Sequence, residues 1–385
     1  MLLQLNEADL RKQNAYETAR EITHQPSMWL KVWDLIKNQK QILESFLKGL
    51  GSDYDIVFLG AGTSEYVGNV LEPYFNKDFD FRLRSVPSTD MITEPDRYIH
   101  PTRPTLCISY GRSGNSPESV GSVLAANTVN DTIHHLFITC NKDGALAQLA
   151  KIQKNTHALI LPDETNDLGF AMTSSFTSMC LATILVFKLE ALDETQEDVE
   201  KLVKAVVHVL EHETTGLFDF IQNYKFERII YLGSNLLKGI AQESALKVLE
   251  LTAGNVATLF DSPTGFRHGP KSFINAKSLI VVYLSDDPLT RRYEVDLLKE
   301  LDAQKKGYKV LVVHHADVQV PCDYRVNLNY DGLSMDYVAL KSIVIAHLIG
   351  FYKSYTSGIT TDNPCPTGEV NRVVTGVTIY PVKEN

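Results

Sequence analysis

The sequence has little cysteine, and its cysteines form no recognisable pair. The five are Cys107, Cys140, Cys180, Cys322 and Cys365. An odd, widely spaced set without a C-x-x-C pair excludes a disulfide framework and a structural zinc site, and it predicts reduced thiols in a cytoplasmic protein. The H-E-x-x-H motif of zinc hydrolases is also missing, so we predict no bound metal.

Positive charge is also scarce. The 37 basic residues face 47 acidic ones, and the formal net charge is −10. This balance lacks the basic excess of a nucleic-acid-binding surface, so no nucleic-acid partner is expected. An anionic substrate would need a local positive site. No G-x-x-x-x-G-K-[ST] sequence offers a nucleotide-binding P-loop, and we expect no cofactor.

Membrane and export signals are weak. The start, "MLLQLNEADLRKQNAYETAR", lacks the apolar run of a signal peptide, so we expect a protein that is not exported. The uncharged stretch from Leu168 to Phe187 is long enough to span a membrane, but hydroxyl residues crowd it and no basic residues flank it. We predict a buried central helix there and no membrane partner.

Short apolar runs alternate with helical stretches along the chain, which is typical of α/β proteins with doubly wound, mainly parallel sheets flanked by helices. A flavodoxin-like sandwich is expected. The predicted strands are 55–60, 81–86, 105–110, 134–139 and 157–162, followed by 228–233, 256–260, 279–285 and 309–314. The length of 385 residues suits two such domains.

The second set of strands begins like the first, because "DIVFLGAGTS" and "RIIYLGSNLL" share an apolar strand ending in Leu-Gly. A duplicated domain explains this similarity. The predicted boundaries are an N-terminal helical segment (1–50), a first domain (51–191), a helical linker (192–224), a second domain (225–362) and a C-terminal tail packed near the site (363–385).

Two loops of the first domain have the composition of an anion site. "GAGTSE" follows the first strand and contains Thr63 and Ser64; "YGRSGNS" follows the third and contains Arg112, Ser113 and Ser116. In parallel sheets, ligands bind where strands end and helices begin, and glycine-rich loops with hydroxyls there hold phosphate. A single phosphate group fits best, because the glycine pattern of a dinucleotide site is incomplete.

Helix initiation alone explains part of the second loop. Ser116 is a suitable N-cap, Pro117 suits the first helical position, and Glu118 complements the helix dipole. A cap needs one hydroxyl, however, and this loop supplies several. Both interpretations stay open at this point.

Three charged residues of the second domain share one helix face. Glu243, Lys247 and Glu250 follow each other at i, i+4 and i+7 in "ESALKVLE". An exposed ion pair between Glu243 and Lys247 is one interpretation. The other is a partly buried carboxylate and ammonium with shifted pKa values, as proton transfer requires, because the residues between them are mostly apolar.

These motifs resemble the sugar isomerase (SIS) domains of phosphosugar isomerases. Among them, "FAMTSSFTSM", "SALKVLELTAG", "FDSPTGFRHGPKS" and "VNRVVTGV" are similar to the AgaS-type galactosamine-6-phosphate deaminase/isomerases. The resemblance runs from about Pro26 to the C-terminus and implies two SIS domains. It implies conversion of D-galactosamine 6-phosphate to D-tagatofuranose 6-phosphate (tagatose 6-phosphate) and ammonia, without a cofactor.

The resemblance also implies roles for individual residues. The phosphate hydroxyls would be Ser64, Ser113 and Ser116, with Arg112 offering its backbone N–H and Thr63 as a lesser candidate; Glu250 would be the catalytic carboxylate, with Lys247 one turn before it, and His268 of "RHGP" the ring-opening histidine. In the related synthase this histidine comes from a neighbouring subunit. A homodimer or higher homo-oligomer with sites at the subunit interface is therefore expected.

Two departures from the family pattern bear on the mechanism. A lysine of the synthase tail that engages the sugar carbonyl is matched by Thr375, with Arg372 the nearest basic residue. The second domain has Asp286 and Asp287 where a phosphate would lie, so only the first domain is expected to bind phosphate.

Other activities remain as alternatives. The sequence also suits a plain aldose/ketose phosphosugar isomerase, or a sugar-phosphate-binding regulator without turnover. Because residue 2 is Leu2, we expect no glutaminase nucleophile of the amidotransferase kind. His268 could also be an ordinary loop histidine bonded to backbone.

Overall fold

The computed structural model describes residues 1–51, 53–314, 318–328, 332–374 and 376–382. Contacts divide the chain into two compact units. We call residues 27–167, 174–196 and 368–385 the first-sheet unit, and residues 1–26, 168–173 and 197–367 the second-sheet unit. The long helix α2 (Tyr16–Lys48) contributes residues to both.

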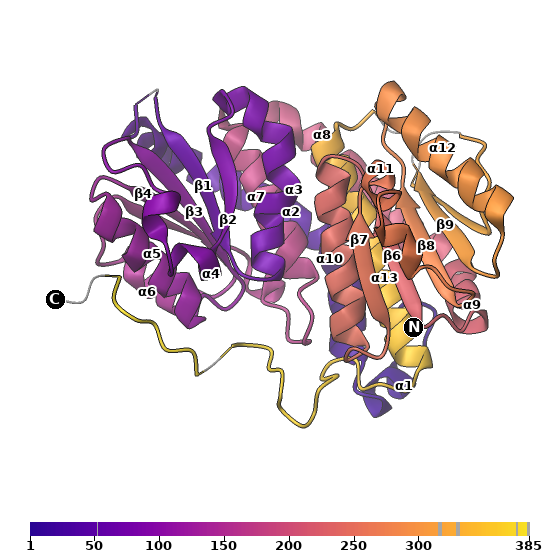
Figure 1. Cartoon of the computed structure of the whole chain (residues 1–385). Helices are drawn as coiled ribbons and strands as arrows, with labels where there is room; N and C mark the ends of the chain where they lie inside the picture. Colours follow the sequence, from indigo (N-terminus) through magenta and orange to yellow (C-terminus); the bar gives the residue numbers. More distant parts are fainter. Residues whose placement is uncertain (52, 315–317, 329–331, 375, 383–385) are drawn as a thin grey trace. The chain divides into compact units, whose positions relative to one another are not determined.

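The first-sheet unit is built on a parallel sheet in the order β2-β1-β3-β4-β5 (Figure 1). Its strands are β1 (Asp55–Gly60), β2 (Leu83–Pro87), β3 (Thr105–Gly111), β4 (His134–Thr139) and β5 (Thr156–Ile160). Its main helices are α3 (Thr63–Phe75), α4 (Ser88–Met91), α5 (Pro117–Val129), α6 (Ala145–Ala150) and α7 (Ser174–Phe187). Each predicted strand of this domain lies within two residues of an observed one.

Alternating side chains of β1 explain why helices cover both faces of this sheet. Val57 and Leu59 join the core cluster under α4 and α5, which includes Met91 and Ala126. Phe58, between them, faces the other way and stacks on Phe187 at the end of α7. Parallel sheets covered on both faces need strands with a continuous apolar run, as the residues 56–59 of β1 provide.

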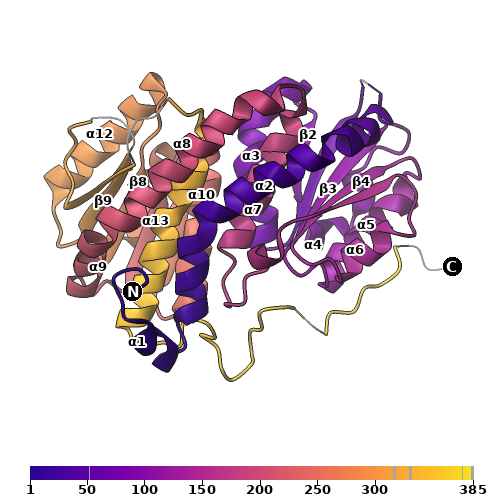
Figure 2. The same cartoon turned by 180° about the vertical axis from the view of Figure 1, so that it is seen from behind.

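The second-sheet unit repeats this design, with strand order β10-β9-β8-β6-β7. Its strands are β6 (Arg228–Leu232), β7 (Ala257–Asp261), β8 (Ser278–Tyr283), β9 (Lys309–His314) and β10 (Tyr324–Asn327). Its helices are α1 (Glu7–Lys12), α8 (Thr195–His208), α9 (Thr214–Asn223), α10 (Leu236–Leu251), α11 (Pro263–Phe266), α12 (Pro288–Gln304) and α13 (Met335–Thr356). The helix α13 packs against both α10 and α9 (Figure 2). The sequence did not predict β10.

Two helices are apolar enough to raise the question of a membrane. Residues Ser174–Val186 of α7 are buried in the structure, as predicted, but the helix begins at Ser174 and not near Leu168. The Asp167 carboxylate accepts hydrogen bonds from the backbone N–H groups of Ser174 and Ser175 and thereby starts the helix. The observed α7 has 14 residues and is too short to span a membrane by itself. By length and composition α13 could span one, but 94% of its most apolar window is buried.

Candidate functional site

The first serine loop connects β1 to α3 through a tight turn that contains two glycines, Gly60 and Gly62. A side chain at Gly60 would lie 2.3 Å from the backbone of Ser64, so only glycine fits there. Gly62 has φ 56° and ψ −129°, a conformation that favours glycine. Thr63 and Ser64 then occupy the first turn of α3 and are largely buried.

The second serine loop connects β3 to α5. Ser116 is the N-cap of α5 and accepts a hydrogen bond from the N–H of Ser119, while Pro117 begins the helix. The helix-initiation interpretation is therefore correct. Ser113 lies one turn earlier, where its hydroxyl accepts from the N–H of Asn115 at 3.2 Å.

The two loops leave the sheet side by side. Strands β1 and β3 are parallel neighbours, with Leu59 opposite Ser109. Their carboxyl ends therefore meet at one edge, and the first turns of α3 and α5 follow there. Ser64, Ser113 and Ser116 reach the same edge, which is what a shared phosphate site requires.

Arg112 ties the second loop to the C-terminal tail. Its guanidinium donates to the carbonyl of Arg372 at 2.6 Å. Arg372 in turn donates through Nε to the carbonyl of Asp167 at 2.8 Å and through Nη2 to the amide oxygen of Asn166 at 3.1 Å. Thr375, the residue matched to the synthase lysine, lies outside the described residues.

The helix α10 carries a buried cluster of charges. Lys247 Nζ lies 2.5 Å from Glu250 Oε2 and 3.3 Å from Glu243 Oε1. The side chains of Lys247 and Glu243 are 0% exposed, whereas Glu250 is 25% exposed. The exposed-ion-pair interpretation is therefore wrong. It fails because α13 covers this face of α10, which the helix sequence alone does not reveal.

Burial and charge act in opposite directions on this cluster. Desolvation lowers the pKa of Lys247, but the charges of Glu243 and Glu250 outweigh it, and the pKa of Lys247 is raised. Burial, with a smaller contribution from the Lys247 charge, lowers the pKa of His347 on α13 to about 3. The cluster thus holds an ammonium beside a neutral imidazole, with one carboxylate, Glu250, reaching solvent.

His268 lies elsewhere in the second-sheet unit. It is exposed and follows α11, in a loop where Gly269 has φ 122°. Arg267, its neighbour, pairs with Glu300 of α12 at 2.8 Å, and Lys271 also contacts that carboxylate. Alternate side chains of β6 and β8 point to opposite faces of the sheet. Those on one face pack against α12 and Phe266, close to His268 in the sequence, and those on the other face contact α10, which carries Glu250. The structure does not bring His268 to Glu250 within one chain.

Potential metal ligands form no complete site in the described part of the chain. Among the described residues, no group of three or more His, Cys, Asp or Glu side chains could hold a metal ion. His208 and His212 stand four residues apart and their rings are 4.5 Å apart, but no further ligand joins them in the described part of the chain.

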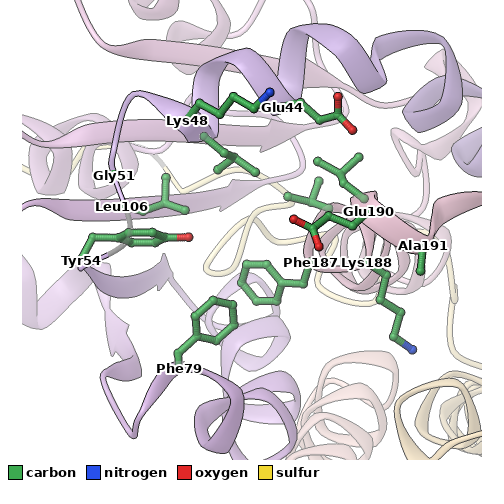
Figure 3. Close-up of a pocket in the computed structure, with 13 residues that line it drawn as sticks. Glu44, Lys48, Gly51, Tyr54, Phe79, Leu106, Phe187, Lys188, Glu190 and Ala191 are labelled. Carbon is green, nitrogen blue, oxygen red and sulfur yellow. The ribbon is translucent and has the colours of Figure 1, made fainter.

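A separate cavity of about 650 Å³ lies in the first-sheet unit (Figure 3). Tyr54 and Glu190 point their polar ends into it, and Phe79 and Phe187 line one side. Leu106, near the start of β3, also lines it, so the cavity lies at the amino ends of the strands. It is thus at the edge opposite the serine loops and is not part of the candidate site.

Comparisons with known proteins agree with this organisation. The SIS domain family matches residues 51–189. The chain is 41% identical over 370 residues to the D-galactosamine-6-phosphate deaminase AgaS of Escherichia coli, covering 94% of this chain and 95% of that protein. It is 38% identical over 385 residues to the protein of that name from Shewanella sp. ANA-3, covering 98% and 95%.

Solved structures give the same result. A tagatose-6-phosphate ketose/aldose isomerase from Escherichia coli superposes with a TM-score of 0.86 at 37% identity, covering 96% of this chain and 97% of that one. A structure from Clostridium novyi NT superposes with a TM-score of 0.95 at 41% identity, covering 99% of each chain. Both similarities extend over the two sheets and their helices.

Proposed function

The chain belongs to the AgaS-type family of D-galactosamine-6-phosphate deaminases, and from this membership we propose that it converts D-galactosamine 6-phosphate to D-tagatofuranose 6-phosphate (tagatose 6-phosphate) and ammonia. The observation that carries the substrate assignment is the 41% identity over 370 residues to the Escherichia coli deaminase. The buried Lys247 beside the partly exposed Glu250 carries the chemical assignment, because it provides a fixed carboxylate for proton transfer.

The phosphate of the substrate is proposed to bind at the serine loops. Ser64, Ser113 and Ser116 would donate hydroxyl hydrogen bonds, with Thr63 as a further donor. The backbone N–H of Arg112 would contribute as well. The first turns of α3 and α5 support this, because the positive end of each helix dipole favours an anion there.

Glu250 is proposed as the base and acid of the reaction. In the open-chain aldehyde, its carboxylate removes the proton from C2 while the C1 oxygen takes up a proton from water, which gives an enolamine. The carboxylate then returns its proton to C1, and the amine nitrogen loses a proton to water. The product carries an imine at C2. Water adds to this carbon, the C–N bond breaks, and ammonia leaves with the ketose 6-phosphate. Lys247 stays protonated, holds Glu250 in place and orients the oxygen and nitrogen substituents at C1 and C2.

Ring opening precedes this step, and we assign it to His268 of a neighbouring subunit. The exposure of His268 and its separation from Glu250 within one chain support this assignment. A homodimer or higher homo-oligomer with sites at the subunit interface follows from it. We also propose a cytoplasmic location, as for a metabolic enzyme with reduced cysteines. Water consumption in the deamination makes the enzyme a hydrolase as well as an isomerase.

The domain assignment is part of the same proposal. Residues 51–191 and 225–362 would be the two SIS domains, joined by the helical linker 192–224, with the tail 363–385 near the site. The match of the SIS family to 51–189 supports the first of them. The strand order of both sheets supports grouping them with flavodoxin-like folds.

A plain aldose/ketose phosphosugar isomerase is the second candidate. It is favoured by the name of the Escherichia coli structure, a tagatose-6-phosphate ketose/aldose isomerase. The two candidates differ in one product. Incubation with galactosamine 6-phosphate, glucosamine 6-phosphate, their N-acetyl forms and tagatose 6-phosphate, followed by assays of ammonia and of sugar phosphates, separates them. Ammonia from galactosamine 6-phosphate supports the deaminase; interconversion of nitrogen-free sugars alone supports the isomerase, and binding without turnover a regulator.

A further inference from the structure

The cavity at the amino edge of the first sheet has the size of a ligand pocket. Its volume is about 650 Å³, and pockets for small organic molecules span about 300–1,000 Å³. All its lining residues belong to the first-sheet unit. They come mainly from the end of α2, the loop before β1, the turn before β2 and the end of α7. The function proposed above leaves this cavity without a role.

Phenylalanine rings form one wall of the cavity. The ring centroid of Phe187 lies 5.0 Å from that of Phe79, and it lies 5.1 Å from Phe75 and 5.9 Å from Phe58 deeper in the unit. Phe187 and Phe79 are only partly buried, and both line the cavity. Aromatic rings attract apolar groups and, through their faces, cations.

The turn that carries Phe79 is held in a strained conformation. Asp80 and Phe81, which follow it, have φ 50° and 60°, although both carry side chains. Asn76 fixes this turn, because its side-chain oxygen accepts from the N–H of Leu83 at 3.1 Å and its carbonyl accepts from the N–H of Phe81 at 2.9 Å. The aromatic wall of the cavity is therefore preformed.

Two polar groups face each other beside this wall. Figure 3 shows the hydroxyl of Tyr54 and the carboxylate of Glu190 pointing toward one another. Within the part of the chain that the structure describes, neither group has a hydrogen-bond or salt-bridge partner. Burial raises the pKa of Tyr54, so its hydroxyl stays protonated at neutral pH.

The lysines of the lining do not neutralise Glu190. Lys188 points its ammonium away from the carboxylate of Glu190 (Figure 3). Lys48 and Glu44 both come from α2, one turn apart, and their opposite charges balance on that side of the cavity. Glu190 is thus the charge that faces the phenol, and a ligand that matches it carries a cation.

We propose that this cavity binds a small organic ammonium compound with an apolar, preferably aromatic, body. The ammonium lies between Glu190 and Tyr54, where it donates to the carboxylate and to the phenol oxygen. The body of the ligand packs on Phe79 and Phe187. This site is independent of the proposed function, because no residue of the serine loops or of α10 lines the cavity.

Three probes that differ in one group test the site on the full-length chain. Benzylamine has the ring and the cation, benzyl alcohol keeps the ring without the charge, and methylamine keeps the charge without the ring. Ligand-observed NMR titrations at about pH 7, where an alkyl amine is protonated, give each dissociation constant. We expect benzylamine to bind with a Kd of about 1 mM or below, which suits its few atoms, and the other two probes to bind about tenfold more weakly.

Variants locate the bound probe. Glu190→Gln keeps the shape of the side chain and removes its charge, so it should weaken benzylamine about tenfold and abolish its advantage over benzyl alcohol. Tyr54→Phe should weaken benzylamine about two- to tenfold. Glu194→Gln is the matched control, because Glu194 is an exposed carboxylate of the same short helix, Leu189–Glu194, and does not line the cavity. It should leave binding unchanged.

The contrary results are equally specific. Equal binding of benzylamine and either other probe overturns the proposal, and so does a benzylamine that fails to bind at about 10 mM. If Glu190→Gln binds benzylamine like Glu194→Gln, the ligand lies elsewhere and the proposed site is wrong. The comparison of probes uses the wild type, and Tyr54→Phe tests the location if Glu190→Gln does not fold. Failure of the deaminase assay would count against the proposed function alone.

Discussion

Replacement of Lys247 by methionine should destabilise the protein severely, because it leaves a buried carboxylate without its cation. Glu243 is 0% exposed and lies 3.3 Å from the ammonium. Breaking a buried ion pair from one side costs about 3–5 kcal/mol. Glu250 loses the same partner, but its 25% exposure lets water compensate in part. We therefore expect about 3–5 kcal/mol less free energy of unfolding for Lys247→Met.

A double-mutant cycle separates this charge effect from lost packing. Glu243→Gln combined with Lys247→Met removes both charges, so the double variant should recover about 2 kcal/mol or more relative to the sum of the single changes. Lys201→Met is the matched control, because Lys201 pairs with Glu197 at the same i,i+4 spacing, with side chains 37% and 76% exposed. It should change stability by less than about 1 kcal/mol.

Urea denaturation, followed by far-UV circular dichroism, measures all four variants. The free energies are compared at one pH between 7 and 8, where the raised pKa of Lys247 keeps it charged. The reasoning is refuted if Lys247→Met resembles Lys201→Met, or if the effects of the cycle simply add within about 0.5 kcal/mol. Either result would mean that groups other than Lys247 stabilise the buried carboxylate of Glu243.

Three further predictions concern binding, pH and subunit assembly. Ser116→Ala should weaken substrate binding by about 1–3 kcal/mol, seen as a raised KM with a similar kcat; an unchanged KM removes this hydroxyl from the phosphate site. Because the pKa of His347 falls to about 3 on folding, the unfolded chain binds more protons, and stability should decline as pH drops from roughly 6.5 toward 3. His347→Leu should flatten this decline in acid unfolding curves, and an equally steep curve would contradict the assignment. Mixing inactive Glu250→Gln and His268→Asn chains under exchange conditions should restore part of the activity, whereas no recovery would place both residues of a site on one chain.

The sequence predicts the central strands well because each is a continuous apolar run bounded by glycine or polar residues. It fails for β10, "YRVN", because apolar and polar residues alternate there over only four positions, which is too short a pattern to identify a strand. Helix starts depend on contacts from outside the helix: Asp167 lies seven residues before Ser174, and nothing in "LGFAMT" marks the boundary.

In the candidate site, too, the sequence predicts features that depend on local residues and misses those that depend on distant contacts. The serine loops are visible in the sequence because turn residues and caps are local signals. The burial of Lys247 is not visible, since it depends on α13, about ninety residues further along the chain.

The most direct test of the proposed chemistry is the rate of ammonia release from D-galactosamine 6-phosphate by the wild type and by Glu250→Gln. The wild type should release one ammonia per tagatose 6-phosphate formed. The variant keeps the shape of the side chain and a partner for Lys247, so it should fold normally and lose about 10²–10⁴-fold in kcat, the usual contribution of a general base. A Glu250→Gln protein with full activity, or a wild type that releases no ammonia, would contradict the account.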